Sequence, residues 1–414
     1  MERNESASLR FGVFLPPYHR SEQNPTLAIH RDLALIELWD RLGLDEVWVG
    51  EHHSGGVELI ASPEQFLAAA AMRTRRIRLG TGVVSLPYHH PFMVAQRIVL
   101  LDHLSHGRAM LGVGPGALPL DASMLGIGQS VTRLRLEEGL VAVLALLDAR
   151  APVSMTTDWF SLDRAQLHLE PFSRAGVEVA VAGAVSPSGP RLAGRYGCGL
   201  LSIGATSPAG FEALHGHWEV MLEQAELHDR TVDRAAWRLA GPMHIAETRE
   251  QAYRDVEYGL LDWARYFQHV GAVPQVQVVG ETTGELIEGV NRDGVGVIGT
   301  PEDAIAQIRR LLEQSEGFGC HLLIGHDWAA PEQTARSYEL FARFVMPEFQ
   351  GTMDSLRRSR AQSMASFESL SAEQAAALAA AKQRYETERS MNLVESGAGQ
   401  LDPTFDLTPE KEEP

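Results

Sequence analysis

The amino-acid sequence predicts a (β/α)8 TIM barrel, the α/β fold in which eight parallel strands close into a cylinder inside a ring of helices. Eight short apolar runs occur along the chain, and segments with helical periodicity lie between them. The runs are continuously apolar rather than alternating, as strands buried on both faces require. Polar residues and glycines gather directly after several runs, where barrel enzymes build their active sites.

The eight predicted strands start at Arg10, Glu46, Ile77, Ala109, Val177, Gly199, Trp237 and Cys320. Between them, residues 26–42, 63–72, 91–104 and 301–312 carry apolar side chains at helical spacing. The last three segments open with proline, which the first helical turn tolerates because its missing N–H has no partner there. Repeated strand–helix alternation predicts that the sheet closes into a barrel.

Two stretches are too long to be simple connections and are predicted to be insertions on the barrel. The first covers about residues 148–176 and contains WFSLDRAQLHLEP, whose alternation predicts a hairpin. The second covers about residues 248–299 and mixes aromatic residues with glycine. Because long loops at the carboxyl rim of a barrel often cover its mouth, both insertions are expected to act as lids.

The chain is expected to divide into a barrel over residues 10–349 and an appendage over residues 350–414. An alanine-rich helix is predicted at residues 371–389, and the Gly, Pro and acid-rich residues after it predict a disordered acidic tail. The appendage is a candidate contact between subunits. We expect a homodimer or a larger homo-oligomer, because symmetric dimers are the commonest oligomers.

Composition excludes several classes of function. The 414 residues are 44% hydrophobic and 22% charged, as in a globular enzyme. The formal net charge of −18 argues against a nucleic-acid or anionic-membrane partner, since both bind clustered Lys and Arg. Cys198 and Cys320 provide neither a disulfide framework nor a zinc spacing. With no signal-like or membrane-spanning apolar segment, the chain is expected to be soluble and cytoplasmic.

Glu51, His52 and His53 directly follow the strand predicted to start at Glu46. Adjacent residues after a strand point in different directions, so His52 and His53 form a poor metal site, and no metal is expected. We expect one of the two histidines to face the barrel mouth. From position alone, His52 is as consistent with a structural histidine as with a catalytic one.

Glycine-rich turns follow the third and fourth predicted strands, in Gly80-Thr81-Gly82 and Val113-Gly114-Pro115-Gly116. A flat ligand or a phosphate can approach a backbone that carries no Cβ, and an ordinary tight turn explains the glycines equally well. The second turn does not have the glycine spacing of a dinucleotide-binding fingerprint.

The fifth predicted strand runs into Val185, Ser186, Ser188 and Gly189, just before a helix that Pro190 can start. Hydroxyls, backbone amides and the positive end of a helix converge there, which suits a phosphate group. An ordinary serine N-cap is the alternative. Other polar or aromatic residues at or just past strand ends are more simply explained by packing or exposure: His89, His90, His244, His326 and Trp328.

Several motifs, in chain order, resemble one known family. They are FGVFLPPY, WVGEHHSGG, ASPEQFLAAAAMRTRRIRLGTGVVSLPYHHP, LDHLSHGRAMLGVGPGALPLDASMLG and SPSG. Their residues and order resemble the bacterial luciferase-like flavin monooxygenases, and within that family the limonene monooxygenase-type group. The resemblance extends from residue 10 to about residue 349 and is not expected to include the C-terminal segment.

The resemblance implies a barrel that binds reduced FMN, supplied by diffusion from a separate flavin reductase, with O2 as co-substrate. By position, His52 matches the family's active-site histidine, and Glu51 is expected to orient its ring. Residues 80–82 and 113–116 match the turns at the flavin ring, and Ser186, Ser188 and Gly189 match the phosphate turn. Luciferases carry an arginine where this chain has Pro115, so Arg191 and Arg195 are candidates to supply the missing charge.

The implied activity is oxygenation of a small, fairly apolar organic substrate through a flavin hydroperoxide, by epoxidation, hydroxylation or Baeyer–Villiger insertion. Three alternatives stay open at this point. They are a deazaflavin-dependent oxidoreductase on the same barrel, a catalytically silent flavin-binding or partner-binding barrel, and a metal-dependent barrel hydrolase. A deazaflavin enzyme turns over without dioxygen, whereas a monooxygenase consumes it.

Overall fold

The structure is a computed structural model that describes residues 8–148, 150–271 and 278–394. Contacts divide the chain into two compact units, Met1–Gly351 and Thr352–Pro414. The acidic tail predicted at the end of the chain lies largely outside the described residues. Among the helices that the structure describes, none combines the length and the apolar character needed to cross a membrane.

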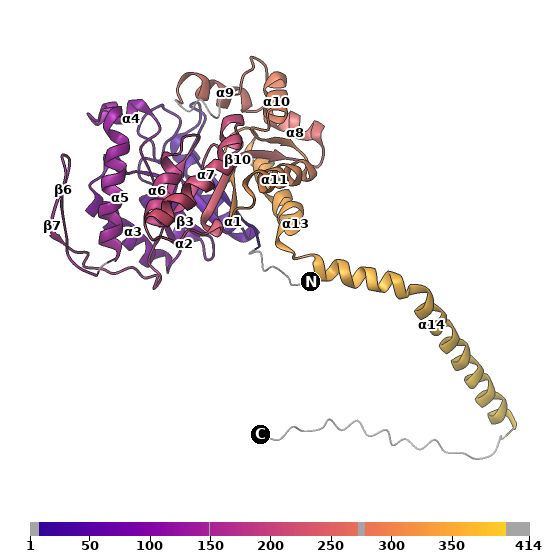
Figure 1. The fold of residues 1–414 in the computed structure, drawn as a ribbon. Helices are drawn as coiled ribbons and strands as arrows, with labels where there is room; N and C mark the ends of the chain where they lie inside the picture. The colour runs from indigo at the N-terminus through magenta and orange to yellow at the C-terminus, as the bar shows by residue number, and fades with distance from the viewer. Residues whose placement is uncertain (1–7, 149, 272–277, 395–414) are drawn as a thin grey trace. The chain divides into compact units, whose positions relative to one another are not determined.

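Eight parallel strands close into a barrel, as predicted (Figure 1). In order around the barrel they are β1 (Arg10–Leu15), β2 (Glu46–Val49), β3 (Arg78–Thr81), β5 (Ala109–Gly114), β8 (Glu178–Gly183), β9 (Gly199–Ser202), β10 (Trp237–Ile245) and β12 (Cys320–Ile324). Strand β12 pairs with β1 and closes the cylinder. Two short strands add to its carboxyl end, where β4 (Val84–Ser85) pairs with β5, and β11 (Val297–Gly299) pairs with β10.

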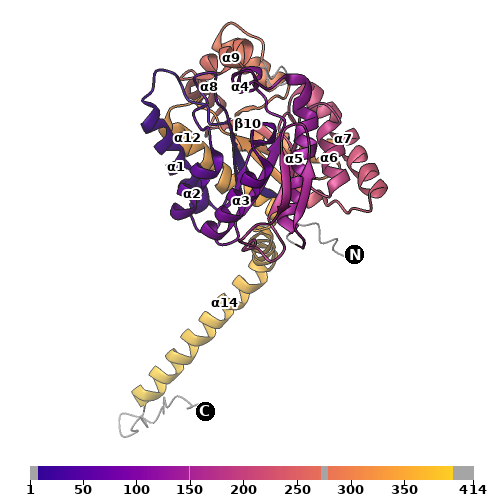
Figure 2. The ribbon, with the colours of Figure 1, turned by 90° about the vertical axis from the view of Figure 1, so that its left-hand side faces the viewer.

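Helices surround the barrel (Figure 2). The principal ones are α1 (Pro25–Leu42), α2 (Pro63–Arg73), α3 (Pro91–Ser105), α5 (Thr132–Asp148), α6 (Ser188–Tyr196), α7 (Pro208–Leu227), α11 (Pro301–Ser315) and α12 (Pro331–Leu340). The four helices predicted from periodicity agree with α1, α2, α3 and α11 to within a few residues. Each of these four has proline in its first turn, where the backbone nitrogen lacks an intrahelical acceptor.

Side chains fill the inside of the barrel, and the fully buried Trp48 is one of them. Phe14, Trp48 and Leu201 belong to one buried cluster contributed by several strands. At the amino end of the barrel, Arg238 Nε and Trp48 Nε1 each donate to Glu46 Oε2 at 2.9 Å. The buried charges are tolerated because they pair with one another. The barrel is therefore a packed core, and its carboxyl rim is the place for a site.

The first insertion forms the predicted hairpin from β6 (Val153–Thr156) and β7 (Ser161–Ala165), but it is not a lid. Phe160, Leu162 and Leu167 pack against α3 and α5, and Figure 1 shows the hairpin alongside these helices. The expectation of a lid was wrong here because α5 returns the chain to the amino end of the barrel. The insertion starts from that end, and its apolar side covers helices.

The second insertion lies at the carboxyl rim. It forms α8 (Arg249–Val256), α9 (Leu260–His269) and α10 (Thr283–Arg292) around an apolar cluster of its own. Tyr18, which follows β1, and Trp328, which follows β12, belong to the same cluster. Figures 1 and 2 show α8 and α9 at the same end of the molecule as α4 (Pro119–Met124). This insertion therefore has the position expected of a cover over the rim.

The second unit contains α14 (Asp354–Val394), which is longer than the helix predicted at residues 371–389. Its large apolar side chains are exposed, among them Met364, Phe367 and Leu378. A role for this helix as a contact between subunits stays a prediction.

Candidate active site

Polar side chains from several segments meet at the carboxyl end of β2. The Gly82 amide donates to Val49 O at 2.6 Å, so the segments that follow β2 and β3 leave the barrel side by side. Glu51, His52 and His53 follow β2, as predicted. Helix α4, after β5, adds Asp121, and the second insertion adds Tyr266 from α9.

Glu51 is buried and accepts three hydrogen bonds. Its Oε1 accepts from His53 Nε2 at 2.8 Å and from His89 Nε2 at 2.6 Å, and its Oε2 accepts from the Ser85 amide at 2.8 Å. Burial alone would raise the pKa of Glu51, but these hydrogen bonds outweigh burial and lower it to about 2. The expectation that Glu51 orients His52 was wrong, because its oxygens bind His53 and His89.

His52 instead lies between two other carboxylates. Its Nδ1 is 3.2 Å from Asp121 Oδ2, and its Nε2 is 3.4 Å from Glu58 Oε2. Burial alone would lower the pKa of His52, but the negative charges of Glu58 and Asp121 outweigh burial and raise it. His52 therefore keeps its proton to a higher pH than a free imidazole does.

Two hydroxyl groups complete the network around His52. Tyr266 Oη donates to Glu58 Oε2 at 2.6 Å, which is the oxygen that faces His52, and Ser54 Oγ donates to Asp121 Oδ1. Burial raises the pKa of Glu58. Burial acts in the same direction on Asp121, but hydrogen bonds from His52 and Ser54 outweigh it and lower that pKa. Because Tyr266 belongs to α9, the second insertion contacts the His52 network directly.

Sequence reasoning missed Glu58, Asp121 and Tyr266 as partners of His52. Asp121 lies in the segment LPLDASMLG, directly after the fourth predicted strand, so its rim position was the available signal. Glu58 and Tyr266 have no spacing relation to His52 that indicates proximity. Only the path of the loop after β2 and the docking of α9 bring them together.

The glycines of the first turn make room for Trp48. A Cβ on Gly80 would lie 2.5 Å from the Trp48 ring, and one on Gly82 would lie 2.8 Å from Trp48 Cβ. Thr81 is fully buried, and its Oγ1 donates to Gly112 O at 2.9 Å. Crowding by the Trp48 side chain is therefore a sufficient reason for glycine at these two positions. Contact between this turn and a flavin ring stays a prediction.

The second glycine turn brings an unpaired phenol to the rim. Val113 is buried in the core between barrel and helices, whereas Pro115 is half-buried. Gly116 has a φ of +88°, and a Cβ there would overlap the Tyr88 hydroxyl. That hydroxyl is buried and has no hydrogen-bond partner within the described residues, and burial raises the pKa of Tyr88 to about 12. Tyr88 therefore offers a neutral donor beside the turn that contains Gly114.

The predicted phosphate turn lines a groove of about 400 Å³ at the start of α6. The hydroxyls of Ser186 and Ser188 lie 2.8 Å apart. A Cβ on Gly189 would lie 2.5 Å from Ala182 O, so only glycine allows α6 to start this close to β8. The remaining lining residues are Arg133, Pro187, Arg191, Val220 and Gln224. Val185 is not among them, and its carbonyl accepts from His217 Nε2 at 3.0 Å.

The groove has two guanidinium groups, and one of them was not foreseen. Arg191 and Arg195 both pair with Glu137 of α5, at 2.6 and 2.8 Å. Arg191 lines the groove and Arg195 does not. The geometry therefore favours Arg191 as the replacement for the arginine that luciferases carry at the position of Pro115. Arg133, near the start of α5, supplies the second guanidinium. The positive end of α6 and these side chains together suit an anion.

His244, near the end of β10, and His326, after β12, pack against neighbouring side chains. His326 stacks on Trp328 with ring centroids 4.1 Å apart, and its Nε2 donates to Met243 O at 3.1 Å. Burial lowers the pKa of His326 to about 3, so this ring is neutral. His244 Nε2 lies 3.2 Å from Asp255 Oδ2. The packing interpretation of these residues therefore agrees with the structure.

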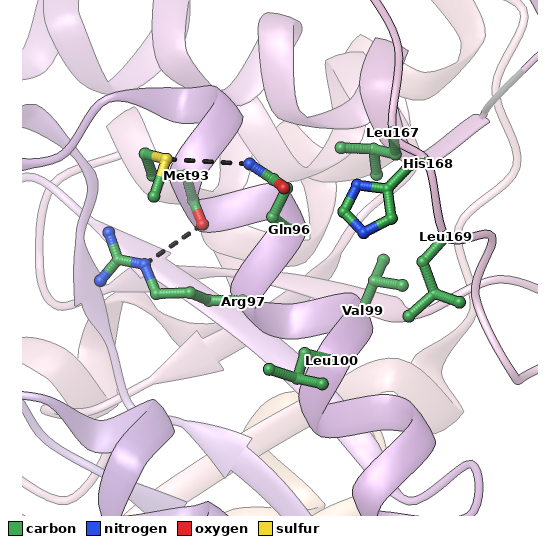
Figure 3. Close-up of a pocket in the computed structure, with 8 residues that line it drawn as sticks. All are labelled: Met93, Gln96, Arg97, Val99, Leu100, Leu167, His168 and Leu169. Atoms are coloured by element: carbon green, nitrogen blue, oxygen red, sulfur yellow. Dashed lines mark hydrogen bonds between the residues drawn. The ribbon is translucent and has the colours of Figure 1, made fainter.

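A separate groove of about 250 Å³ lies on the outer face of α3 (Figure 3). It is lined by Met93, Gln96, Arg97, Val99, Leu100, Leu167, His168 and Leu169. These residues come from α3 and from the irregular segment that follows β7, and none of them is a predicted site residue. This groove is therefore not part of the candidate active site.

The barrel and its rim define an oxidoreductase of the luciferase-like class, and comparison with known proteins agrees. The profile described as "Luciferase-like monooxygenase" matches residues 9–317. The chain belongs to this family.

Two curated relatives cover nearly the whole chain. The limonene 1,2-monooxygenase of Rhodococcus erythropolis is 49% identical over 385 residues, which cover 92% of this chain and 97% of the relative. The 4-hydroxyprotoasukamycin monooxygenase of Streptomyces nodosus subsp. asukaensis is 46% identical over 356 residues, which cover 85% and 95%. The first alignment is longer than residues 10–349, so it includes part of the C-terminal segment. The expectation that the resemblance ends near residue 349 was wrong.

Solved structures share the fold. One is the oxygenating constituent of 3,6-diketocamphane monooxygenase from Pseudomonas putida, described as a type II Baeyer–Villiger monooxygenase in complex with FMN. It has a TM-score of 0.68 and 26% identity and covers 83% of this chain and 99% of its own. The monooxygenase RslO1 of Streptomyces bottropensis has a TM-score of 0.72 at 24% identity, covering 82% and 100%, which shows the fold alone.

Proposed function

We propose that this protein is the oxygenase of a two-component system, which uses reduced FMN and O2 to oxygenate a small, fairly apolar organic molecule. The observation that carries the proposal is the shared rim. The His52 network after β2 and the anion groove after β8 both lie at the carboxyl ends of barrel strands. A separate flavin reductase would supply reduced FMN by diffusion.

The residues present fit FMN at its phosphate end. Ser186 and Ser188 offer hydroxyls, Arg133 and Arg191 offer guanidinium groups, and the first amides of α6 have no intrahelical acceptor. All of these groups are donors, as a phosphate requires. At the ring end, the Tyr88 hydroxyl is a buried donor without a partner among the described residues. An unpaired buried donor is costly, so a ligand acceptor would stabilise this arrangement.

Each part of the rim then has a separate task. Reduced flavin held by these residues would supply the electrons that activate dioxygen for transfer of one oxygen atom to the substrate. His52 holds a proton for this chemistry, and its Nε2, which makes the longer carboxylate contact, is the atom that we assign to the reacting groups. The negative charges of Glu58 and Asp121 raise the pKa of this ring. The apolar cluster of α8–α10 would exclude water from the rim.

The family relationship supports the reaction class, whereas the substrate rests on analogy. The names of relatives mention limonene and diketocamphane, and we propose a substrate of comparable size and polarity. The proposed reaction is epoxidation, hydroxylation or Baeyer–Villiger insertion of this substrate. The two free, buried cysteines are consistent with the proposed cytoplasmic location, because thiols persist in a reducing compartment.

Oxygen uptake with an unrelated flavin reductase, NADH and FMN tests the proposal. Wild-type protein should produce an oxygenated product with an atom from ¹⁸O2, and His52→Ala should lose product formation while still binding FMN. Unchanged product formation by His52→Ala would remove His52 from the mechanism. Turnover under anaerobic conditions with a deazaflavin would favour the hydride-transfer alternative, and tight flavin binding without any turnover would favour the silent barrel.

A further inference from the structure

Three ligand-type atoms converge next to His52 in an arrangement that the proposed function does not require. Glu51 Oε1, His53 Nε2 and His89 Nε2 all lie within 4.8 Å of one another. Two imidazoles and one carboxylate are a common donor set for divalent transition metals. The adjacent pair His52 and His53 is a poor site. In contrast, His53 and His89 come from two neighbouring segments, so their rings approach one point from different sides.

The surroundings hold these ligands in place. The Ser85 amide donates to Glu51 Oε2 at 2.8 Å, which fixes the carboxylate and leaves Oε1 directed at the two histidines. The His53 ring packs against the Tyr88 ring at a centroid distance of 6.1 Å. Glu51 and His53 closely follow β2, and His89 follows the short strand β4 and one 3-10 turn, so little chain entropy is lost when they bind an ion. Hydrogen-bonded carboxylate ligands and rigid supports are features of working metal sites.

Charge and access also favour a cation. The Glu51 carboxylate accepts hydrogen bonds from His53, His89 and the Ser85 amide, which favour its negatively charged form. Asp121 contributes further negative potential at His53. The side chains of His53 and His89 are 24% and 20% exposed, so an ion can enter and water can occupy the open coordination positions.

We propose that Glu51, His53 and His89 form a binding site for a divalent transition-metal ion such as Zn²⁺, with water completing its coordination. Tetrahedral zinc needs donor atoms roughly 3.3 Å apart. The carboxylate oxygen is 2.8 and 2.6 Å from the two nitrogens, so it moves outward as the ion replaces the bridging protons. Each imidazole then carries its remaining proton on Nδ1.

The experiment measures metal binding to the full chain in the absence of FMN. A failure to bind metal would therefore leave the proposed monooxygenase function unaffected. Metal-free protein is titrated with Co²⁺, whose visible absorption reports coordination number, and then with Zn²⁺, followed by calorimetry. Wild-type protein should bind one ion with a low-coordinate Co²⁺ spectrum that Zn²⁺ displaces. His53→Gln and His89→Gln should each weaken binding at least tenfold. His90→Gln is the matched control, because His90 is the next residue and its Nδ1 accepts from the Phe92 amide at 3.3 Å.

Two results would overturn the proposal. One is the absence of saturable one-to-one binding to folded wild-type protein. The other is equal binding by wild type, His53→Gln and His89→Gln, which would place the ion at another surface histidine. Circular dichroism shows whether each variant is folded. If a variant is unfolded, the Co²⁺ spectrum of the wild-type protein tests the proposal by itself, because a spectrum typical of octahedral, all-oxygen coordination contradicts ligation by two histidines. Loss of binding in His90→Gln alone would likewise contradict the assignment.

Discussion

The substitution Asp121→Asn tests whether the buried carboxylates keep His52 protonated. Of the two carboxylates beside His52, Asp121 keeps its negative charge to the lower pH. The pKa of Asp121 is lowered, whereas burial raises the pKa of Glu58. The replacement keeps the size and shape of the side chain and still offers an acceptor to Ser54. It removes one negative charge 3.2 Å from His52 Nδ1.

The expected shift follows from that distance. At 3.2 Å and an effective dielectric constant of about 20, the attraction between unit charges is about 5 kcal/mol, which is an upper bound. Measured effects of one opposite charge at such range are about 1–3 pKa units. The charge of Asp121 raises the pKa of His52, so its removal lowers that pKa. If protonated His52 is the active form, the alkaline limb of the pH–rate profile moves to lower pH by at least one unit.

The assay is product formation against pH, together with an NMR titration of the His52 ring in ¹³C-labelled protein. The NMR readout is essential because a merely structural effect would lower the rate at every pH without moving the midpoint. Ser54→Ala is a useful comparison, because it removes the hydroxyl donor to Asp121 and leaves the carboxylate in place. An unchanged His52 midpoint in Asp121→Asn would refute the electrostatic argument.

Three further predictions concern other parts of the rim. The pKa of Glu51 is lowered to about 2, so its ionised form stabilises the fold above that pH. As pH falls from about 4.5 toward 2, the wild-type protein should lose about 3 kcal/mol of stability relative to Glu51→Gln, measured by urea unfolding. The same pH dependence of stability in both proteins would contradict this. Arg133→Ala should weaken FMN binding roughly 10–100-fold by calorimetry, as expected for a charge-assisted hydrogen bond, whereas Arg135→Ala, whose guanidinium lies over the Trp159 ring, should not. Gly80→Ala should lower the free energy of unfolding by about 1–3 kcal/mol because its methyl group meets the Trp48 ring, and an unchanged unfolding midpoint would show that the barrel interior relaxes freely.

The barrel could be predicted because its signal is local and repeated. Each strand is buried on both faces, so each leaves a continuous apolar run, and each prolyl helix start leaves its own mark. The lid assignment of the first insertion failed for a physical reason. A long loop is visible in sequence, but the end of the barrel from which it starts depends on the direction of the preceding helix.

The partners of His52 could not be predicted, because ion pairing depends on distance in space. Glu51 is adjacent to His52 in sequence, yet the backbone after β2 turns its carboxylate toward His89. Glu58 and Tyr266 reach the site through a loop and a separately folded insertion. Similarly, Arg133 has no motif of its own, and only the packing of α5 beside α6 places it at the groove.

By itself the sequence determined the eight strands, the helices between them, the rim positions of His52 and of the Ser186–Gly189 turn, and the family. These features follow from periodicity and from short motifs, which a chain carries regardless of how it folds elsewhere. Only the tertiary structure decided that Glu51 binds His53 and His89, that Asp121 and Glu58 hold His52, and that Trp48 explains the glycines. Those contacts depend on how loops, helices and strands pack in space, and electrostatic and packing energies depend on separations of a few ångströms that sequence distance does not encode.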